Sequence, residues 1–146
     1  MNRTMGWMLA ALLPLFALDA AAQGVQPPNE RIEAFLTGVA KDSDAAVDKL
    51  FKGSREEKIS GKVADQLKAR LKTTIPILGR YSGFDKLSDK ELGPSLRRLV
   101  YLQKFESLPA LWVIYLYKSG PNEWIINTMN FTLNLTDPVA GVLNGI

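Results

Sequence analysis

The 146-residue chain contains no cysteine and no histidine. Thiol and imidazole groups are the usual zinc ligands, nucleophiles and bases near neutral pH. Their absence therefore excludes zinc sites, Ser-His-Asp triads, Cys-His dyads, disulfides and haem attachment. Acid–base chemistry by carboxylate, tyrosine or lysine groups remains possible, and so does simple binding. No spacing in the sequence singles out one of these, and we expect no metal and no cofactor.

A strong excess of charge of one sign is also lacking. The 18 Lys and Arg residues are set against 15 Asp and Glu residues, which gives a formal net charge of +3, and 47% of the chain is hydrophobic. Charges of both signs are interleaved, whereas a nucleic-acid-binding surface gathers Lys and Arg on one face. We therefore expect one globular domain that binds no nucleic acid.

The first 22 residues predict a secretory signal peptide. Arg3 precedes the largely apolar run Met5–Leu18, and alanines 20–22 supply the small residues that a signal peptidase recognises. The run is too short for a membrane anchor, which needs roughly 20 apolar residues. We expect cleavage after about Ala22, a periplasmic or secreted protein without a membrane anchor, a short linker over residues 23–29 and a single domain over residues 30–146.

Helical spacing dominates the first half of the mature chain. Apolar residues at positions 32, 35, 36 and 39 predict a helix over about residues 30–41. Asp42 or Ser43 is expected to cap a second helix that stops at Gly53. A capping-box spacing at residues 54–57 precedes a long amphipathic helix within residues 56–78, which Pro76 should kink or end.

After Gly79 the pattern changes to β-branched and aromatic runs separated by turn residues. Leu96–Phe105, Ala110–Tyr117 and Trp124–Leu133 are predicted strands, and Tyr81–Leu87 is a possible fourth. A helical turn could follow at residues 139–143. Helices first and an antiparallel meander afterwards indicate an α+β fold, with three N-terminal helices packed on a curved sheet of three to four strands.

Both faces of this sheet are rich in large apolar side chains. If Tyr117 pairs with Glu123, one face carries the residues that we assign to a ligand pocket under the helices: Val113, Tyr115, Asn127 and Met129. The opposite face carries those that we assign to a homodimer interface: Tyr101, Trp112, Ile114, Leu116 and Trp124. Alternatively, residues 134–146 fold back over this second face, and a slip of one residue would exchange the two sets.

Several polar residues have both a functional and a structural interpretation. Asn127 could bond a ligand, although a backbone partner is the commoner outcome for a buried amide, and Tyr115 could line the same cavity. Arg97 and Arg98 could hold an anion but are more typical of a solvated edge. Asp85 and Asp89 could be acid–base groups, or simply turn residues.

Four segments carry a family resemblance: Leu-Gly-Arg-Tyr-Ser-Gly-Phe at 78–84, Tyr-Leu-Gln-Lys-Phe at 101–105, Tyr-Leu-Tyr-Lys at 115–118 and Trp-Ile-Ile-Asn at 124–127. The chain resembles small exported bacterial proteins and is similar over about residues 30–135 to the nuclear transport factor two-like superfamily, which includes ketosteroid isomerases. The resemblance implies a cone-shaped roll, dimerisation through the sheet and a pocket between sheet and helices. The isomerase members use a carboxylate base with a tyrosine and a protonated carboxyl group. No position here matches that trio, so no catalytic residue is carried over.

These observations favour an exported, non-catalytic binding or accessory module, with an apolar pocket for a small ligand and a homodimer through the sheet. One alternative is an isomerase- or dehydratase-like enzyme that uses Asp and Tyr on a small apolar substrate. Another is a protein partner bound by the aromatic sheet face.

Overall fold

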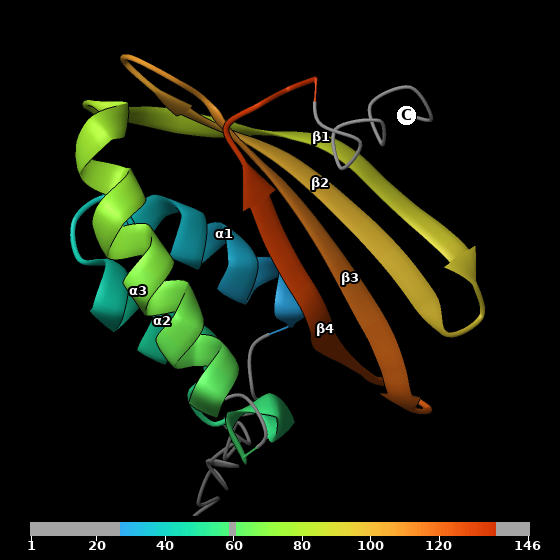
Figure 1. The fold of residues 1–146 in the computed structure, drawn as a ribbon. Helices are drawn as coiled ribbons and strands as arrows, with labels where there is room; N and C mark the ends of the chain where they lie inside the picture. Colours follow the sequence, from blue (N-terminus) through green and yellow to red (C-terminus); the bar gives the residue numbers. More distant parts are fainter. Residues whose placement is uncertain (1–26, 59–60, 137–146) are drawn as a thin grey trace, which may run out of the picture.

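A computed structural model describes residues 27–58 and 61–136 of the chain (Figure 1). The predicted signal peptide, most of the predicted linker and the predicted turn at residues 139–143 lie outside these ranges. The described elements are, in order, α1 (Pro28–Gly38), α2 (Ser43–Phe51), the 3-10 turn η1 (Arg55–Lys58), α3 (Gly61–Leu78), β1 (Tyr81–Gly93), β2 (Leu96–Phe105), β3 (Ala110–Gly120) and β4 (Glu123–Thr132).

The α+β fold class is confirmed. The strands form one antiparallel sheet in the order β1-β2-β3-β4, and the three α-helices gather on one side of it (Figure 1). Each strand neighbours the one that precedes it in the chain, so β1 and β4 are the two edges. No helix in the described ranges is long and apolar enough to cross a membrane.

The helices begin and end where local chemistry permits. α1 begins at Pro28, two residues before the predicted start, because the first turn of a helix has no need of the amide that proline lacks. Asp42 caps α2 as predicted, and its carboxylate accepts the Ala45 N–H at 2.9 Å. Gly53 follows α2 with φ of 72°, a left-handed conformation that glycine adopts without strain.

The segment predicted as one long helix is divided. Residues 55–58 form the separate turn η1, and α3 begins at Gly61. The Glu57 carboxylate reaches back to the Gly53 N–H at 2.8 Å, so the capping spacing stabilises a turn rather than the start of α3. Pro76 lies inside the last turn of α3, which ends at Leu78.

β2 has the predicted bounds, whereas β1 is longer than predicted. It continues to Gly93 and shifts register three times against β2, the first time between Tyr81 and Gly83. An edge strand tolerates such bulges because only one of its sides must pair. The predicted pairing of Tyr117 with Glu123 is wrong, since Glu123 pairs with Gly120 and Tyr117 with Ile125.

The assignment of the two sheet faces is also wrong. Tyr101, Trp112, Ile114 and Leu116 are fully or almost fully buried and form one core with the apolar residues of the three helices. Trp124 is half-buried against the same core. These five residues were predicted to form a dimer interface on the face away from the helices, but they lie on the helix-covered face instead.

The helix-free face has a smaller apolar cluster. Val100 and Leu111 are fully buried there, with Leu87 and Leu102 packed against them, and Val113 is also buried. Tyr117, on the same face, is 47% exposed, so this face is buried at its centre and open at the Tyr117 end.

One polar network is enclosed in the main core. Gln103, which is fully buried, accepts the Trp112 indole N–H at 2.9 Å and donates to the Leu36 carbonyl at 2.7 Å. The bond to Leu36 joins β2 to α1, and the bond from Trp112 joins β3 to β2. Both are needed because an unpaired polar group here would be costly.

Candidate functional site

The four residues predicted to line a ligand pocket do not come together. Val113 and Tyr115 lie on the helix-free face, where they pair with Asn130 and Thr128 of β4. Met129 packs against the core on the other face. Asn127 is exposed at a bulge where β4 shifts register, and its amide donates to Thr128 Oγ1 at 3.1 Å, so it is not the buried amide that alternation predicted.

The polar residues singled out by sequence are paired with neighbours on the sheet. Arg97 donates twice to Asp89, at 2.6 and 2.7 Å, and Lys104 donates to Asp85 at 2.8 Å. Arg98 pairs with Tyr115 across the sheet, one strand position away from Arg97. These contacts favour the interpretation of Arg97, Asp85 and Asp89 as surface ion pairs.

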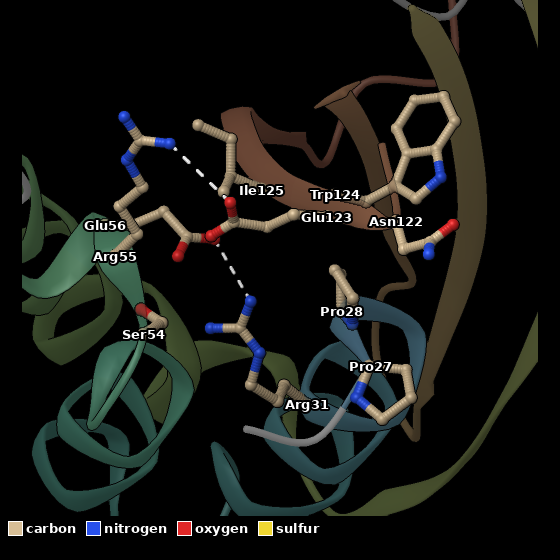
Figure 2. Close-up of a pocket in the computed structure, with 10 residues that line it drawn as sticks. All are labelled: Pro27, Pro28, Arg31, Ser54, Arg55, Glu56, Asn122, Glu123, Trp124 and Ile125. Atoms are coloured by element: carbon tan, nitrogen blue, oxygen red, sulfur yellow. Dashed lines mark hydrogen bonds and ion pairs between the residues drawn. The ribbon is translucent and has the colours of Figure 1, made fainter. Parts of the chain in front are cut away.

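The structure instead draws attention to Glu56, on η1. Both Glu56 and Arg31 of α1 are buried, and Arg31 Nη2 donates to Glu56 Oε1 at 3.0 Å (Figure 2). Arg31 Nη1 also donates to the Leu50 carbonyl near the end of α2, at 2.9 Å. The same Glu56 oxygen accepts the Ile126 N–H of β4 at 2.7 Å. One carboxylate therefore joins α1, η1 and the edge strand β4.

The surroundings of Glu56 keep it ionised. Burial by itself would raise the pKa of this carboxyl group, but hydrogen bonds from the Ile126 and Glu56 amides, Ser54 and Arg31 outweigh it, and the pKa lies below its usual 4.5. A carboxylate with a lowered pKa is a poor general base and is not protonated near neutral pH, so it has no proton to donate.

Glu56 lines two hollows. The first, the hairpin cleft, has a volume of about 270 Å³ and lies between η1, the start of α1 and the β3–β4 turn (Figure 2). Trp124 and Ile125 provide its apolar wall, and Arg55 forms an exposed ion pair with Glu123 at 3.6 Å. With Arg31 and Glu56 also in its lining, positive and negative charges balance.

The second hollow lies between α3 and β4, and we call it the β4 groove. It consists of two adjoining cavities of about 310 and 280 Å³ that share the lining residues Phe51, Val63, Met129 and Asn130. Gln66, Leu67 and Arg70 complete it on the helix side, and residues 126–128 on the strand side. Val63 is 58% exposed, although it belongs to the apolar stripe of α3 whose members Leu67 and Leu71 are buried.

Side chains from the helical layer cap the edge of β4 at both ends of this groove. Glu56 accepts the Ile126 N–H, and Arg70 Nη2 donates to the Phe131 carbonyl at 2.7 Å. The Arg70 guanidinium also lies 4.2 Å from the centre of the Phe131 ring. Between the caps, the edge of residues 127–130 faces the groove.

A tyrosine–carboxylate pair occurs elsewhere in the described residues, but it does not border either hollow. The Tyr101 hydroxyl donates to Glu33 at 3.0 Å, and Lys86 forms an ion pair with the same oxygen at 2.8 Å. Burial raises the pKa of Tyr101, and the hydrogen bond from Lys86 lowers the pKa of Glu33. The tyrosine is therefore protonated and the carboxylate ionised at neutral pH, and the hydrogen bond between them stabilises both of these states.

Sequence analysis did not select Glu56, Arg31 or Arg70. One signal was present for Arg31, which lies four positions before Phe35 and so shares the apolar face of its helix. A charged side chain on that face predicts a buried partner. Glu56 and Arg70 carry no comparable signal, because they occur among other charged residues.

Comparison of the chain with known protein families, with characterised proteins and with solved structures gives no significant match.

Proposed function

We propose that the protein is an exported, non-catalytic binding module whose ligand site is the β4 groove. The observation that carries this proposal is the exposure of Val63, an apolar side chain in the middle of a concave, mostly apolar surface. Apolar hollows with a few polar groups are the usual form of binding sites. The groove replaces the pocket that alternation placed around Val113 and Tyr115.

The pKa of the carboxyl group that borders both hollows favours a binding function over an enzyme that uses acid–base catalysis. An isomerase or dehydratase would need a carboxyl group whose pKa is raised toward neutrality beside its substrate. Glu56, the carboxyl group that borders both hollows, has a lowered pKa. The Tyr101–Glu33 pair lines neither of them.

Export and the nuclear transport factor two-like relationship are part of this proposal. The tripartite leader supports export to the periplasm or medium, with cleavage after about Ala22. Three helices on one face of a four-stranded meander support the family relationship and its cone-shaped roll. N-terminal sequencing of the exported protein tests the cleavage, and an intact Met1 would refute it.

Homodimerisation also stays a prediction, but its predicted interface must change. The side chains first assigned to it are core residues, so a dimer formed through the sheet would use the helix-free face. Sedimentation velocity of the mature protein at micromolar concentration distinguishes a dimer from a monomer.

A fragment screen with amide mapping tests the site. Small apolar fragments, added to isotope-labelled mature protein, should shift the backbone amide signals of residues 127–130 and of Val63. Shifts confined to Trp124 and the hairpin cleft would assign binding to the wrong hollow. An absence of shifts at either hollow would contradict the proposed function.

A further inference from the structure

We infer that the occupant of the β4 groove is an extended polypeptide segment that pairs with the edge of β4 as a fifth strand and places a carboxylate beside Arg70. This inference rests on the proposed function and names its ligand class. Addition of a strand to a sheet edge supplies backbone hydrogen bonds, and the flanking groove supplies side-chain contacts.

The edge of β4 already pairs with groups that imitate a strand. A backbone partner would accept an N–H and donate to a carbonyl, and here Glu56 accepts from Ile126 while Arg70 donates to Phe131. These contacts show that the Ile126 N–H and the Phe131 carbonyl, at the two ends of this edge, are within reach of partners on the helical side.

The uncapped stretch of residues 127–130 has the length of a short peptide. At roughly 3.3 Å per residue, this stretch is on the order of 13 Å long. Exposed strand edges in soluble proteins are normally blocked, and the two side-chain caps block only the ends of this one. The groove beside it offers Val63 and Met129 as apolar contacts for side chains of the added strand.

The charges in the groove favour a peptide with a carboxylate at the end that lies near Phe131. Glu56 is neutralised by Arg31. Arg70, in contrast, forms no ion pair with any carboxylate of residues 27–58 and 61–136, and its guanidinium contacts the Phe131 carbonyl and ring. A guanidinium has five donors, so a carboxylate can bind alongside the existing bond. The groove therefore suits an apolar segment that has an acidic residue or a free carboxyl terminus at the Phe131 end.

A second copy of the chain is a less suitable occupant. In each copy the β4 edge lies beside α3, which supplies one wall of the groove (Figure 1). Two such edges could approach each other only if both α3 helices moved away. A single extended chain needs no such movement.

A display library of random hexapeptides with free carboxyl termini, selected on immobilised mature protein, tests the inference. We expect enriched peptides with alternating apolar residues that bind residues 127–130 in amide-shift mapping. In an added strand, every second N–H group of the peptide faces β4. Two versions of each peptide can be made, with either the odd or the even backbone nitrogens methylated. We expect binding to be abolished in the version whose methyl groups replace the N–H donors that face β4. Enriched peptides that still bind in both methylated versions would overturn strand addition.

The carboxylate contact is tested by the ratio of affinities for the free acid and for its C-terminal amide. In the wild-type protein the acid should bind about fivefold more tightly, the upper range for a solvent-accessible ion pair. In Arg70→Gln the ratio should fall to about one, whereas Arg70→Lys, which keeps the charge, should retain a preference for the acid. A merely structural role for Arg70 would weaken both peptides equally, and that result would overturn the contact.

The same experiments separate the two proposals. If apolar fragments bind at residues 127–130 but the library yields no peptide that binds there, the binding module stands and the strand-addition inference fails. If the selected peptides bind only after residues 137–146 are deleted, the occupant is the tail of the chain itself, and the inference of a separate partner fails.

Discussion

At the scale of single residues, the buried pair of Arg31 and Glu56 decides how the helices meet the sheet edge. Each side chain is more than nine-tenths buried, and each has a hydrogen bond in addition to the ion pair. Burying two charges has a large desolvation penalty, so such a pair adds little net stability over apolar residues. Removal of one member, however, leaves a buried charge without compensation.

Arg31→Met should therefore lower the free energy of unfolding by about 3 kcal/mol or more. The matched control is Arg55→Met, which breaks an ion pair between side chains that are 62% and 50% exposed and should change stability by less than about 1 kcal/mol. Urea unfolding at neutral pH measures both. Equal effects of the two substitutions would refute the role given to the buried pair.

Glu56 also predicts a dependence of stability on pH. Its pKa in the folded protein lies below the 4.5 expected in the unfolded chain, so unfolding takes up a proton. The stabilisation is complete above pH 4.5 and is lost as the pH falls toward the folded-state pKa. The difference in unfolding free energy between wild type and Glu56→Gln should therefore shrink in urea titrations from pH 7 to pH 3. A difference independent of pH would contradict this assignment.

At the scale of the elements, the helix-covered face of the sheet explains why Trp112 is fully buried. Its ring meets Phe35 of α1 edge-on, with centroids 5.2 Å apart, and packs against Phe131 of β4 at 4.7 Å. Its indole N–H is bound by Gln103. The helices, the central strands and the edge strand are thus joined through one side chain.

Trp112→Ala should lower the free energy of unfolding by about 3–5 kcal/mol, since it opens a cavity and leaves Gln103 without its donor. Tyr117→Ala, on the same strand but 47% exposed, should cost no more than about 1 kcal/mol. Thermal or chemical unfolding compares the two. If Trp112 were instead exposed on an interface, the alanine variant would leave the stability of the monomer almost unchanged.

Two glycines at opposite ends of α3 should respond differently to substitution by alanine. Gly79 has φ of 83°, and a Cβ there would lie 3.2 Å from the Glu106 Cβ, so Gly79→Ala should cost more than about 1 kcal/mol. Gly61, at the start of α3, has open space and no positive φ, so Gly61→Ala should be neutral or slightly stabilising. Melting temperatures test the pair, and a destabilised Gly61→Ala would contradict the account of this helix.

The sequence predicted the types of the helices and strands better than it predicted which face of the sheet each side chain occupies. Periodicity located all three α-helices and the three long strands, and it offered the start of β1 as a possible fourth, because apolar spacing reports local geometry directly. The bulge at Asn127 reverses the alternation of β4, however, and nothing in the sequence marks it. A usable signal did exist on β2, where Arg98 and Lys104 flank Val100 and Leu102 on one face and thereby indicate the side without helices.

At the scale of the whole molecule, the helices and the sheet enclose one main core and separate along the edge of β4. The Glu56 and Arg70 contacts hold β4 to the helical side at two points, and Val63 of α3 is left exposed beside the strand. The candidate site could not be predicted from sequence because it depends on how α3 packs beside β4. Helical spacing gives Val63 the same expected burial as Leu67 and Leu71.

The central claim is that the β4 groove is the binding site. The most direct test compares the ligand affinities of the variants Val63→Asp and Ile77→Asp. Affinity is measured by calorimetric titration with a peptide or fragment obtained from the screens. Both substitutions place a carboxylate on an exposed apolar position of α3, 58% and 63% exposed, but Val63 lines the groove and Ile77 does not. We predict that Val63→Asp weakens binding about tenfold or more, as expected for a charge placed in an apolar site, and that Ile77→Asp leaves it unchanged. Equal affinities in the two variants would contradict the account.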